Sequence, residues 1–532
     1  MVTIFLKLFS FQLNYHWLTL GGAIFLTLCL NYSFYTTFDE VAAQTGFTYL
    51  IFCGKIVYIL ILTLALEILS LRLSVKYVLG FVLLLSSVCA YYMDSLGISI
   101  NEDIIQSVVE THTDEVFDMI NFGLVMYVLG FGILPCVVLR FLKLKRLTFK
   151  KSCKQKVLIL GILSALIALS YMTWGKDIVF VFKAQKSLAD KPNPIAPIRS
   201  AILYVQHLQE HDFAPMLVAQ DAHLNANTPP QIVLFVIGES ARSANFSLNG
   251  YDKPTNPYTS ALNVISFKNF YSCGVVTAIS VPCMLTHYTH QSYTHRNLSL
   301  YVNNILDIAQ DVGYEVWYLG NNGGKCVGGC DRNIKHTIIY PSDSLDSIML
   351  PDIAHIVENA QKKQQNTFIV AHGYGSHGAS YTNRYPLEFE TFTPVCKEKE
   401  LSKCTHEEIV NAYDNSILYN DWILAQMIHI LEKVKMRSML WYVSDHGESL
   451  GELGQYMHGG LGYTLAPKYQ IHIPSIMWFN NQWENTPTLA LNKKDATLSH
   501  DYIFHTLLTL LGIQTQDYDK NLDILYHHTI KK

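Results

Sequence analysis

The 532-residue sequence has few charged residues, and neither sign dominates. Lys and Arg number 39 against 43 Asp and Glu, and charged residues make up 15% of the chain. There is no general basic field of the kind that binds nucleic-acid phosphates, so a polynucleotide substrate is not expected. No internal repeat or low-complexity tract stands out, and the sequence contains no CxxC unit.

Apolar residues, by contrast, make up 50% of the chain and are concentrated in its first third. Several windows there are nearly free of charge over roughly twenty residues, the length that a helix needs to cross a bilayer. We expect five membrane-spanning helices, near residues 14–34, 48–70, 76–93, 120–142 and 156–176. A cleaved signal peptide, with Ala42 and Ala43 as small residues nearby, is the alternative interpretation of the first window.

The connections between these windows differ in charge. Arg72 and Lys76 flank the turn between the second and third windows. The turn between the fourth and fifth contains Arg140, Lys143, Lys145, Arg146, Lys150, Lys151, Lys154 and Lys156. The other two connections are acidic. Because basic loops stay in the cytoplasm, we expect the amino terminus inside and everything after the fifth span outside.

The cysteines that follow the last span occur in close pairs. These are Cys273 with Cys283, Cys326 with Cys330, and Cys396 with Cys404. Paired cysteines in an external domain indicate disulfides. A structural zinc site built from the thiols is the weaker alternative, because the sequence has no CxxC unit and an oxidising compartment favours disulfides.

Beyond the membrane region the pattern predicts an α/β domain. We expect a membrane domain over residues 1–180, a proline-containing connector over 181–230 and a catalytic domain over 231–532. Short β-branched and aromatic runs alternate with helical segments after residue 231, as in a parallel sheet. The clearest predicted strands are Ile232–Ile237, Glu315–Leu319, Thr367–Val370 and Met439–Val443. Polar residues directly follow each of them, where the chemistry of open α/β sheets gathers.

Three of these polar residues form a candidate metal site. Glu239 follows one predicted strand, and Asp445 and His446 follow another. Carboxylate oxygens and an imidazole nitrogen are ligands that zinc accepts in catalytic sites. Each residue alone has an ordinary structural interpretation, as a helix-start acid or a cap.

The candidate nucleophile is Thr277, in the segment CGVVTAISVPC. A hydroxyl needs a base or a metal to become a good nucleophile. At the start of a helix, Thr277 would also gain from amide dipoles that favour phosphates. The alternative is that Thr277 is a simple N-cap.

Further polar side chains lie in glycine-rich loops. His372 and His377 in AHGYGSHG, and His458 in YMHGG, are candidate phosphate binders, acid catalysts or ligands of a second metal. Asn322 and Lys325 in NNGGKC are candidates for contacting the same phosphate. The alternatives are that the histidines are structural residues whose hydrogen bonds are made within the protein, and that Lys325 is a solvent-exposed lysine.

Taken in order, these motifs resemble a known family. They are FVIGESAR from Phe235, CGVVTAISVPC from Cys273, GSHG from Gly375, SDHGESLGE from Ser444, YMHGG from Tyr456 and LSHDYIFHTLL from Leu498. The chain is similar over its whole length to the lipid A phosphoethanolamine transferases, which include the mobile colistin-resistance enzymes.

The resemblance implies a five-helix membrane region followed by an alkaline-phosphatase/sulfatase-like periplasmic domain, in a monomeric multi-pass protein of the bacterial inner membrane. It also implies that Glu239, Thr277, Asp445 and His446 bind one zinc ion tightly, with a second zinc during turnover. Thr277 then takes phosphoethanolamine from phosphatidylethanolamine, releases diacylglycerol, and passes the group to a lipid A phosphate. Such a transfer lowers the negative surface charge and confers polymyxin resistance.

The remaining site residues are assigned by the same resemblance. His372, His377 and His458 match positions that contact phosphoethanolamine or a second zinc, and Lys325 matches a substrate-contacting lysine. The three cysteine pairs match the family's disulfides. The segment NEDIIQSVVETHTDE resembles a lipid-contacting segment, with Thr111 and Glu115 on polar positions and Ser107 where the family has asparagine.

Other functions on the same scaffold remain open: a sulfatase, a phosphoglycerol transferase, or a transferase that acts on lipopolysaccharide core, periplasmic glucan or protein. A catalytically silent membrane sensor is the alternative from another class. Retention of Thr277 and of every proposed ligand argues against a silent protein.

Overall fold

The structure is a computed structural model that describes residues 12–70, 75–110, 119–145, 147–209, 216–341 and 344–526. The chain divides into two compact units. The first consists of residues 1–105 and 120–206, and the second of residues 106–119 and 207–532.

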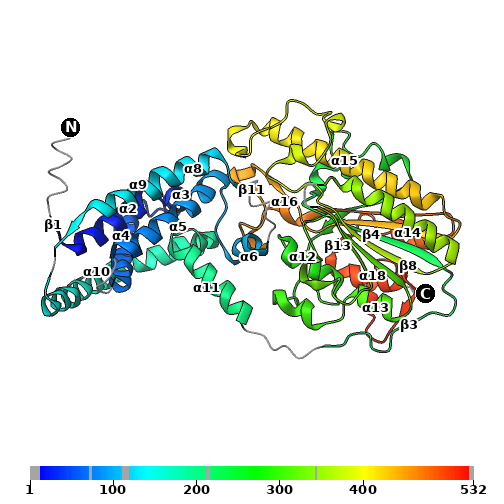
Figure 1. Cartoon of the computed structure of the whole chain (residues 1–532), viewed down its shortest axis with the longest axis horizontal. Helices are drawn as coiled ribbons and strands as arrows, with labels where there is room; N and C mark the ends of the chain where they lie inside the picture. Colours follow the sequence, from blue (N-terminus) through cyan, green and yellow to red (C-terminus); the bar gives the residue numbers. More distant parts are fainter. Residues whose placement is uncertain are drawn as a thin grey trace. The chain divides into compact units, whose positions relative to one another are not determined.

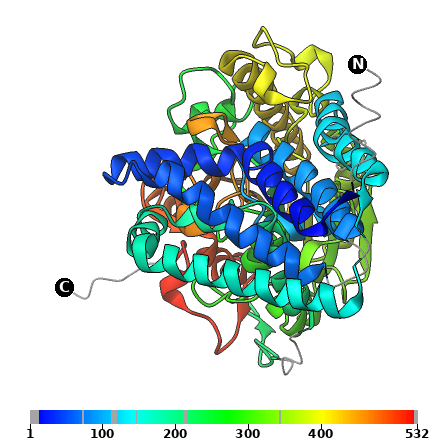
Figure 2. The same cartoon turned by 90° about the vertical axis from the view of Figure 1, so that its left-hand side faces the viewer.

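Helices build the first unit. In chain order, the α-helices among the described residues up to 209 are α2 (Tyr15–Cys29), α3 (Tyr32–Gln44), α4 (Leu50–Leu69), α5 (Val75–Leu96), α6 (Glu102–Glu110), α8 (Phe122–Val128), α9 (Leu134–Phe141), α10 (Phe149–Ala184) and α11 (Ile195–Gln209). A π-helical segment, Leu129–Ile133, joins α8 and α9. Helix α4 packs against both α2 and α10 (Figure 2).

Four of these helical stretches are long and apolar enough to cross a membrane, namely α4, α5, α8 with α9, and α10. Helices α2 and α3 pass the same test as a pair but are bent by 70° at the break between them. Counted as one broken span, this pair makes five, as the sequence predicts. The first span, expected near residues 14–34, is therefore a bent pair of helices that continues to Gln44.

Asn193 supplies hydrogen bonds at this break. Its side-chain Nδ2 donates to the carbonyl oxygen of Leu30 (3.0 Å) and to that of Ser86 in α5 (2.8 Å). Its backbone N–H donates to Asn31 Oδ1 (2.9 Å), and its carbonyl accepts from Asn31 Nδ2 (2.7 Å) and the hydroxyl of Tyr58 (2.9 Å). Asn193 is fully buried. A buried break in a helix needs such partners, because its backbone groups lose their helical ones.

An Asn193→Ala variant is expected to be less stable. The carbonyls of Leu30 and Ser86 would each lose a buried donor, at a cost of about 1–3 kcal/mol per group. Thermal unfolding in detergent should show a lower melting temperature than that of the wild type, whereas Asn227→Ala, at an exposed position, should not. Equal melting temperatures would contradict the anchoring role of Asn193.

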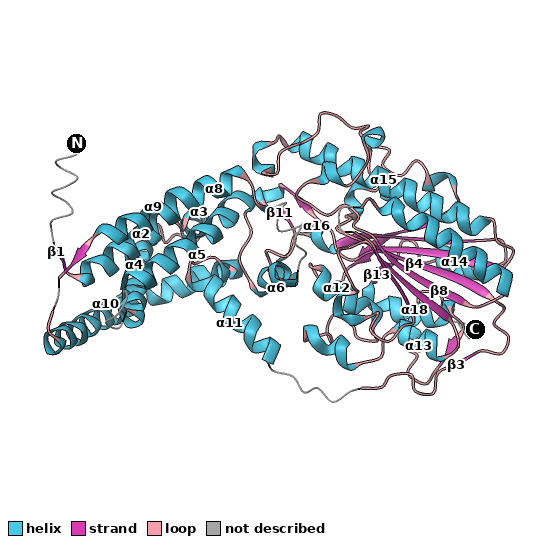
Figure 3. Ribbon diagram, in the orientation of Figure 1, coloured by secondary structure: helices cyan, strands magenta, loops and turns pink. Residues whose placement is uncertain are grey.

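An eight-stranded sheet forms the centre of the second unit (Figure 3). Its strands, in spatial order, are β13 (Thr497–Ser499), β5 (Ile265–Tyr271), β12 (His472–Phe479), β9 (Arg437–Ser444), β4 (Gln231–Gly238), β8 (Thr367–His372), β6 (Glu315–Gly320) and β7 (His336–Ile339). The strands from β9 to β7 are parallel, and β12 runs antiparallel to both of its neighbours. The four strands predicted from the sequence are confirmed as β4, β6, β8 and β9.

Helices cover both faces of this sheet (Figure 1). Side chains along a strand alternate between faces. Val233, Phe235 and Ile237 of β4 therefore share one core with residues of α12 (Thr277–Leu285), α13 (Ile305–Asp311) and α18 (Ile503–Leu510). The alternate residues of β4 share a second core with α14 (Met349–Lys363) and α15 (His406–Glu432). The sequence prediction of an α/β/α domain is thus confirmed.

The described chain also has several short elements besides its 3-10 helices. They are α16 (Lys468–Ile471), α17 (Thr486–Leu491), and the strand pairs β1 (Gln12–Leu13) with β2 (Lys143–Leu144), β3 (His223–Leu224) with β14 (Ile513–Gln514), and β10 (Ser449–Leu450) with β11 (Tyr456–Met457). The three cysteine pairs beyond the membrane helices are disulfide-bonded as expected: Cys273 with Cys283, Cys326 with Cys330, and Cys396 with Cys404.

Candidate active site

The polar residues predicted from the strand ends meet at one edge of the sheet. Strands β4 and β9 are paired in register up to Gly238 opposite Ser444, so the next residues, Glu239 and Asp445, follow adjacent strand ends. His446 comes directly after Asp445. This is the carboxyl edge of the parallel strands, where open α/β sheets place their chemistry.

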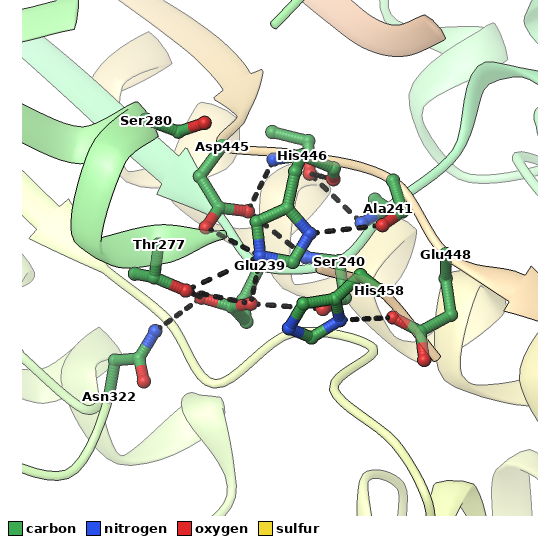
Figure 4. A network of polar contacts seen from close by, with 12 residues as sticks. Glu239, Ser240, Ala241, Thr277, Ser280, Asn322, Asp445, His446, Glu448 and His458 are labelled. Atoms are coloured by element: carbon green, nitrogen blue, oxygen red, sulfur yellow. Dashed lines mark hydrogen bonds and ion pairs between the residues drawn. The ribbon is translucent and has the colours of Figure 1, made fainter. Parts of the chain in front are cut away.

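Thr277 completes this cluster from another element (Figure 4). Its Oγ1 lies 3.2 Å and 3.4 Å from the two carboxylate oxygens of Glu239, and 3.3 Å from Nε2 of His446. His446 Nε2 in turn lies 3.2 Å from Glu239 Oε1 and 3.2 Å from Asp445 Oδ2. The structure therefore brings together the four side chains that the sequence nominates.

The position of Thr277 excludes the simple capping interpretation. Thr277 is the first residue of α12, whereas the N-cap is Val276. The hydroxyl of Thr277 is directed at Glu239 and His446, and it lies in the first turn, where helical amides favour negative charge (Figure 4). The disulfide from Cys273 to Cys283 joins the preceding loop to the same helix.

Burial makes the charges of this cluster interdependent. Burial, together with the negative charge of Glu239, raises the pKa of Asp445 to about 7. Burial alone would lower the pKa of His446, but the charges of Asp445 and Glu239 raise it to about 10. Burial alone would raise the pKa of Glu239, as it does for Asp445. The histidines around Glu239 nevertheless hold its pKa well below the usual value. The cluster of two buried carboxylates thus requires positive charge at its centre.

Hydrogen bonds orient the cluster in the way that a metal ion requires. His446 donates from Nδ1 to the carbonyl of Gly447 (2.9 Å), so Nε2 faces the carboxylates and can hold either a proton or a metal ion. Asp445 Oδ1 accepts from the backbone N–H groups of Ser240 and His446. Within the described part of the chain, Asp445 Oδ2 has no hydrogen-bond donor.

These atoms fit a divalent cation. One ligand atom from each of Glu239, Asp445 and His446 can be chosen so that all lie within 4.8 Å of one another. Two carboxylates, an imidazole nitrogen and a hydroxyl form a ligand set that suits zinc. These ligand atoms, together with Asp445 Oδ2, which lacks a hydrogen-bond donor among the described residues, therefore suit the zinc ion that the sequence predicts.

A second group of side chains lies beside the first. The imidazole of His458 is centred 4.0 Å from that of His446 and 5.4 Å from that of His377. Glu448 holds His458 through a 2.8 Å contact between Oε2 and Nδ1, and it accepts a hydrogen bond from the hydroxyl of Tyr381 (2.9 Å). His446, Glu448 and His458 form a further possible metal-binding group.

Glu448 is a site residue that sequence reasoning missed. It lies within the motif SDHGESLGE, and this is the only signal that marks it in the sequence. Its side chain is fully buried. Only the structure reveals that this carboxylate orients a histidine beside the Thr277 cluster.

Asn322 and His372 contact the cluster through Glu239. Asn322 Nδ2 lies 2.7 Å from Glu239 Oε2 and 2.9 Å from His372 Nε2. His372 is the last residue of β8. Lys325 is exposed, and its charge acts on Asp331. In the described part of the chain, no hydrogen bond or ion pair joins Lys325 to Thr277 or to the candidate ligands.

The predicted lipid-contacting residues lie elsewhere in the sequence. Ser107 belongs to α6, whereas Thr111 and Glu115 fall outside the described residues. Their expected role stays a prediction.

Two family profiles match this chain. The profile of the family described as Sulfatase matches residues 231–513. The profile described as Phosphoethanolamine transferase EptA/EptB matches residues 58–208. Together they cover the apolar helices from residue 58, within α4, onward and the sheet with its candidate site.

Whole-length relatives extend the match across both units. The chain is 31% identical over 539 residues to "Phosphoethanolamine transferase EptA" of Escherichia coli strain K12, covering 96% of each chain. It is 32% identical over 519 residues to "Phosphatidylethanolamine transferase Mcr-1" of Escherichia coli, covering 92% of this chain and 94% of the relative.

A solved structure is similar over the same extent. It is the integral membrane protein lipooligosaccharide phosphoethanolamine transferase A (EptA) from Neisseria meningitidis. It matches 97% of this chain and 99% of its own length, with a TM-score of 0.90 and 28% identity. By sequence and by fold, the chain belongs to the phosphoethanolamine transferase family of EptA and Mcr-1.

Proposed function

We propose that the protein transfers phosphoethanolamine from phosphatidylethanolamine to a lipid A phosphate, through a covalent intermediate on Thr277. The observation that carries this proposal is the contact of Thr277 Oγ1 with both Glu239 and His446 at the buried carboxylate cluster. A hydroxyl in this position is suited to attack phosphorus rather than to cap a helix. Family membership supports phosphoethanolamine as the group transferred.

Zinc is the proposed cofactor, held by Glu239, Asp445, His446 and Thr277. When bound there, zinc would lower the pKa of the Thr277 hydroxyl and neutralise charge on the phosphoryl oxygens. The two buried carboxylates favour a divalent ion over any single side-chain cation. We further propose a second zinc during turnover, near His458 and Glu448.

In the first half-reaction, the Thr277 hydroxyl loses its proton to solvent, and Oγ1 then forms a bond to phosphorus as the bond from phosphorus to the glycerol oxygen breaks. Glu239 accepts a hydrogen bond from the hydroxyl and orients it for attack. The leaving diacylglycerol oxygen needs a proton, and His458 or His377 is the proposed donor. Burial lowers the pKa of His458 below its ordinary value, and the nearby charge of His446 lowers it further, whereas the carboxylate of Glu448 opposes this shift.

In the second half-reaction, a phosphate oxygen of lipid A attacks the same phosphorus atom, and the bond to Thr277 breaks. Asn322 keeps Glu239 oriented in both steps through its 2.7 Å hydrogen bond. The product carries an added ammonium group, so the surface loses net negative charge, which is the proposed basis of polymyxin resistance.

The proposed location is the bacterial inner membrane, with the catalytic domain in the periplasm and the protein monomeric. The apolar helices support membrane insertion. The three disulfides beyond them favour an oxidising compartment, and the positive charge of the basic turns favours a cytoplasmic position for those turns.

Mass spectrometry of lipid A tests the acceptor directly. Cells that express the protein are expected to gain one phosphoethanolamine per modified lipid A, and cells without it are not. Modification of lipopolysaccharide core, glucan or protein instead would overturn the proposed acceptor while leaving the transfer chemistry in place.

A Thr277→Ala variant is expected to lose transfer from labelled phosphatidylethanolamine by roughly 1,000-fold or more, because no other residue replaces the attacking oxygen. Brief reaction of the wild type should leave labelled phosphoethanolamine on the peptide that contains Thr277. Thr286→Ala, at the end of the same helix, is the matched control and should retain transfer, because that hydroxyl bonds only to helix carbonyls among the described residues. Wild-type rates in Thr277→Ala would refute the covalent route.

Glu239→Gln and Asp445→Asn are expected to bind zinc poorly. Purified wild type should retain about one tightly bound ion per chain, the number that one four-ligand site holds. Each variant should retain close to none, because it replaces a charged ligand with a neutral amide. Glu358→Gln, on the exposed surface of α14, serves as the control in the same elemental assay. Unchanged zinc content in either ligand variant removes that residue from the metal site.

A further inference from the structure

His500 has no role in the proposed chemistry, although it belongs to the motif LSHDYIFHTLL. It follows β13 directly, and its side chain is only 1% exposed. Nδ1 accepts a hydrogen bond from the backbone N–H of Cys273 (3.0 Å), and Nε2 donates to the carbonyl of Ser444 (3.0 Å). Because a backbone N–H only donates and a carbonyl only accepts, the neutral Nε2–H tautomer is fixed.

The two backbone groups that His500 joins belong to the two halves of the active site. Cys273 begins the segment that leads to Thr277 in α12. Ser444 is the last residue of β9, directly before Asp445 and His446. A single imidazole ring therefore bridges the segment of the nucleophile and the strand end that carries two of the candidate ligands.

The same segment is held by other side chains. The hydroxyl of Tyr463 donates to the carbonyl of Ser272 (2.9 Å), and His290 Nδ1 contacts the carbonyl of Cys273 (2.6 Å). The backbone N–H of Gly274 donates to Ser280 Oγ in α12 (3.0 Å). His500 differs from these residues because its second hydrogen bond reaches β9 rather than stopping at the segment.

A role for His500 in proton transfer does not fit its surroundings. Burial lowers the pKa of His500 to about 3, so the ring stays neutral at physiological pH. Both ring nitrogens are occupied by backbone groups. His500 can therefore act only through the groups to which it is bonded.

We propose that His500 is a positioning residue, which fixes the segment that carries Thr277 against the strand end that carries Asp445 and His446. This inference rests on the proposed function for its catalytic consequence. Displacing a reacting group by about 1 Å can cost roughly 100-fold in rate. A bridge between two backbone segments prevents such a displacement without touching the substrate.

Three substitutions of His500 in the full-length detergent-solubilised enzyme test the bridge. His500→Phe keeps a ring of similar size and removes both hydrogen bonds. His500→Asn places an amide oxygen near the position of Nδ1, where it can accept from the N–H of Cys273. His500→Gln places an amide nitrogen near the position of Nε2, where it can donate to the carbonyl of Ser444. We expect kcat for phosphoethanolamine transfer to fall by roughly 100-fold in the Phe variant and by less in the other two, with KM for the donor lipid within about threefold of the wild type.

His505→Phe is the matched control. His505 is also a buried histidine, its pKa is lowered by burial to about 4, and its Nδ1 accepts a backbone N–H, that of Asp519 (3.1 Å). It has no hydrogen bond to the Thr277 segment among the described residues. Its replacement should lower the melting temperature but leave kcat within about twofold of the wild type.

Hydrogen exchange gives a readout that does not depend on the substrate. Amides in the peptide covering residues 272–280 should exchange faster in His500→Phe than in His505→Phe, while the β4 peptide covering 232–237 stays protected in both. If the peptide covering residues 272–280 exchanges equally fast in His500→Phe and His505→Phe, or if the two variants have equal kcat, His500 does not position the Thr277 segment and contributes only to packing. If the wild type transfers no phosphoethanolamine, the proposed function fails, and the exchange measurement still decides whether His500 positions this segment.

Discussion

Two buried carboxylates side by side are the constraint on which the second unit depends. Glu239 and Asp445 follow paired strands and are almost wholly inaccessible to solvent. Like charges at this separation cannot both remain ionised unless positive charge lies between them. His446 can contribute one positive charge only by taking a proton on the nitrogen that would otherwise bind a metal. A divalent cation satisfies both carboxylates and leaves His446 neutral.

The architecture explains why such a costly arrangement is held in place. Parallel strands end at one edge of the sheet, so Glu239, His372 and Asp445 arrive together without any long connection between them. Backbone N–H groups bind Asp445 Oδ1, and the amide of Asn322 binds Glu239 Oε2. Thr277 enters from the first turn of α12, where the helix favours negative charge on the attacking oxygen and on phosphate.

Histidines serve different purposes around this centre, according to their partners. His446 and His458 each use Nδ1 for an orienting partner, Gly447 or Glu448, so that Nε2 remains available for chemistry. His500 uses both nitrogens for backbone groups and has none left for substrate. The hydrogen bonds of a buried histidine thus decide whether it takes part in a reaction or fixes the segments around it.

The sequence by itself determined the features that depend on neighbouring residues. Apolar windows, short β-branched runs and closely spaced cysteines revealed the membrane helices, the main strands and the disulfides. Polar residues after the strands marked Glu239, Asp445 and His446, and the segment CGVVTAISVPC marked Thr277. Only the tertiary structure decided the 70° bend after α2, the pairing of Glu448 with His458 and the bridge made by His500. The bond from Asn31 to Asn193 spans 162 positions, and that from Cys273 to His500 spans 227. Local patterns cannot specify such partners, because packing of the whole unit determines which buried groups meet.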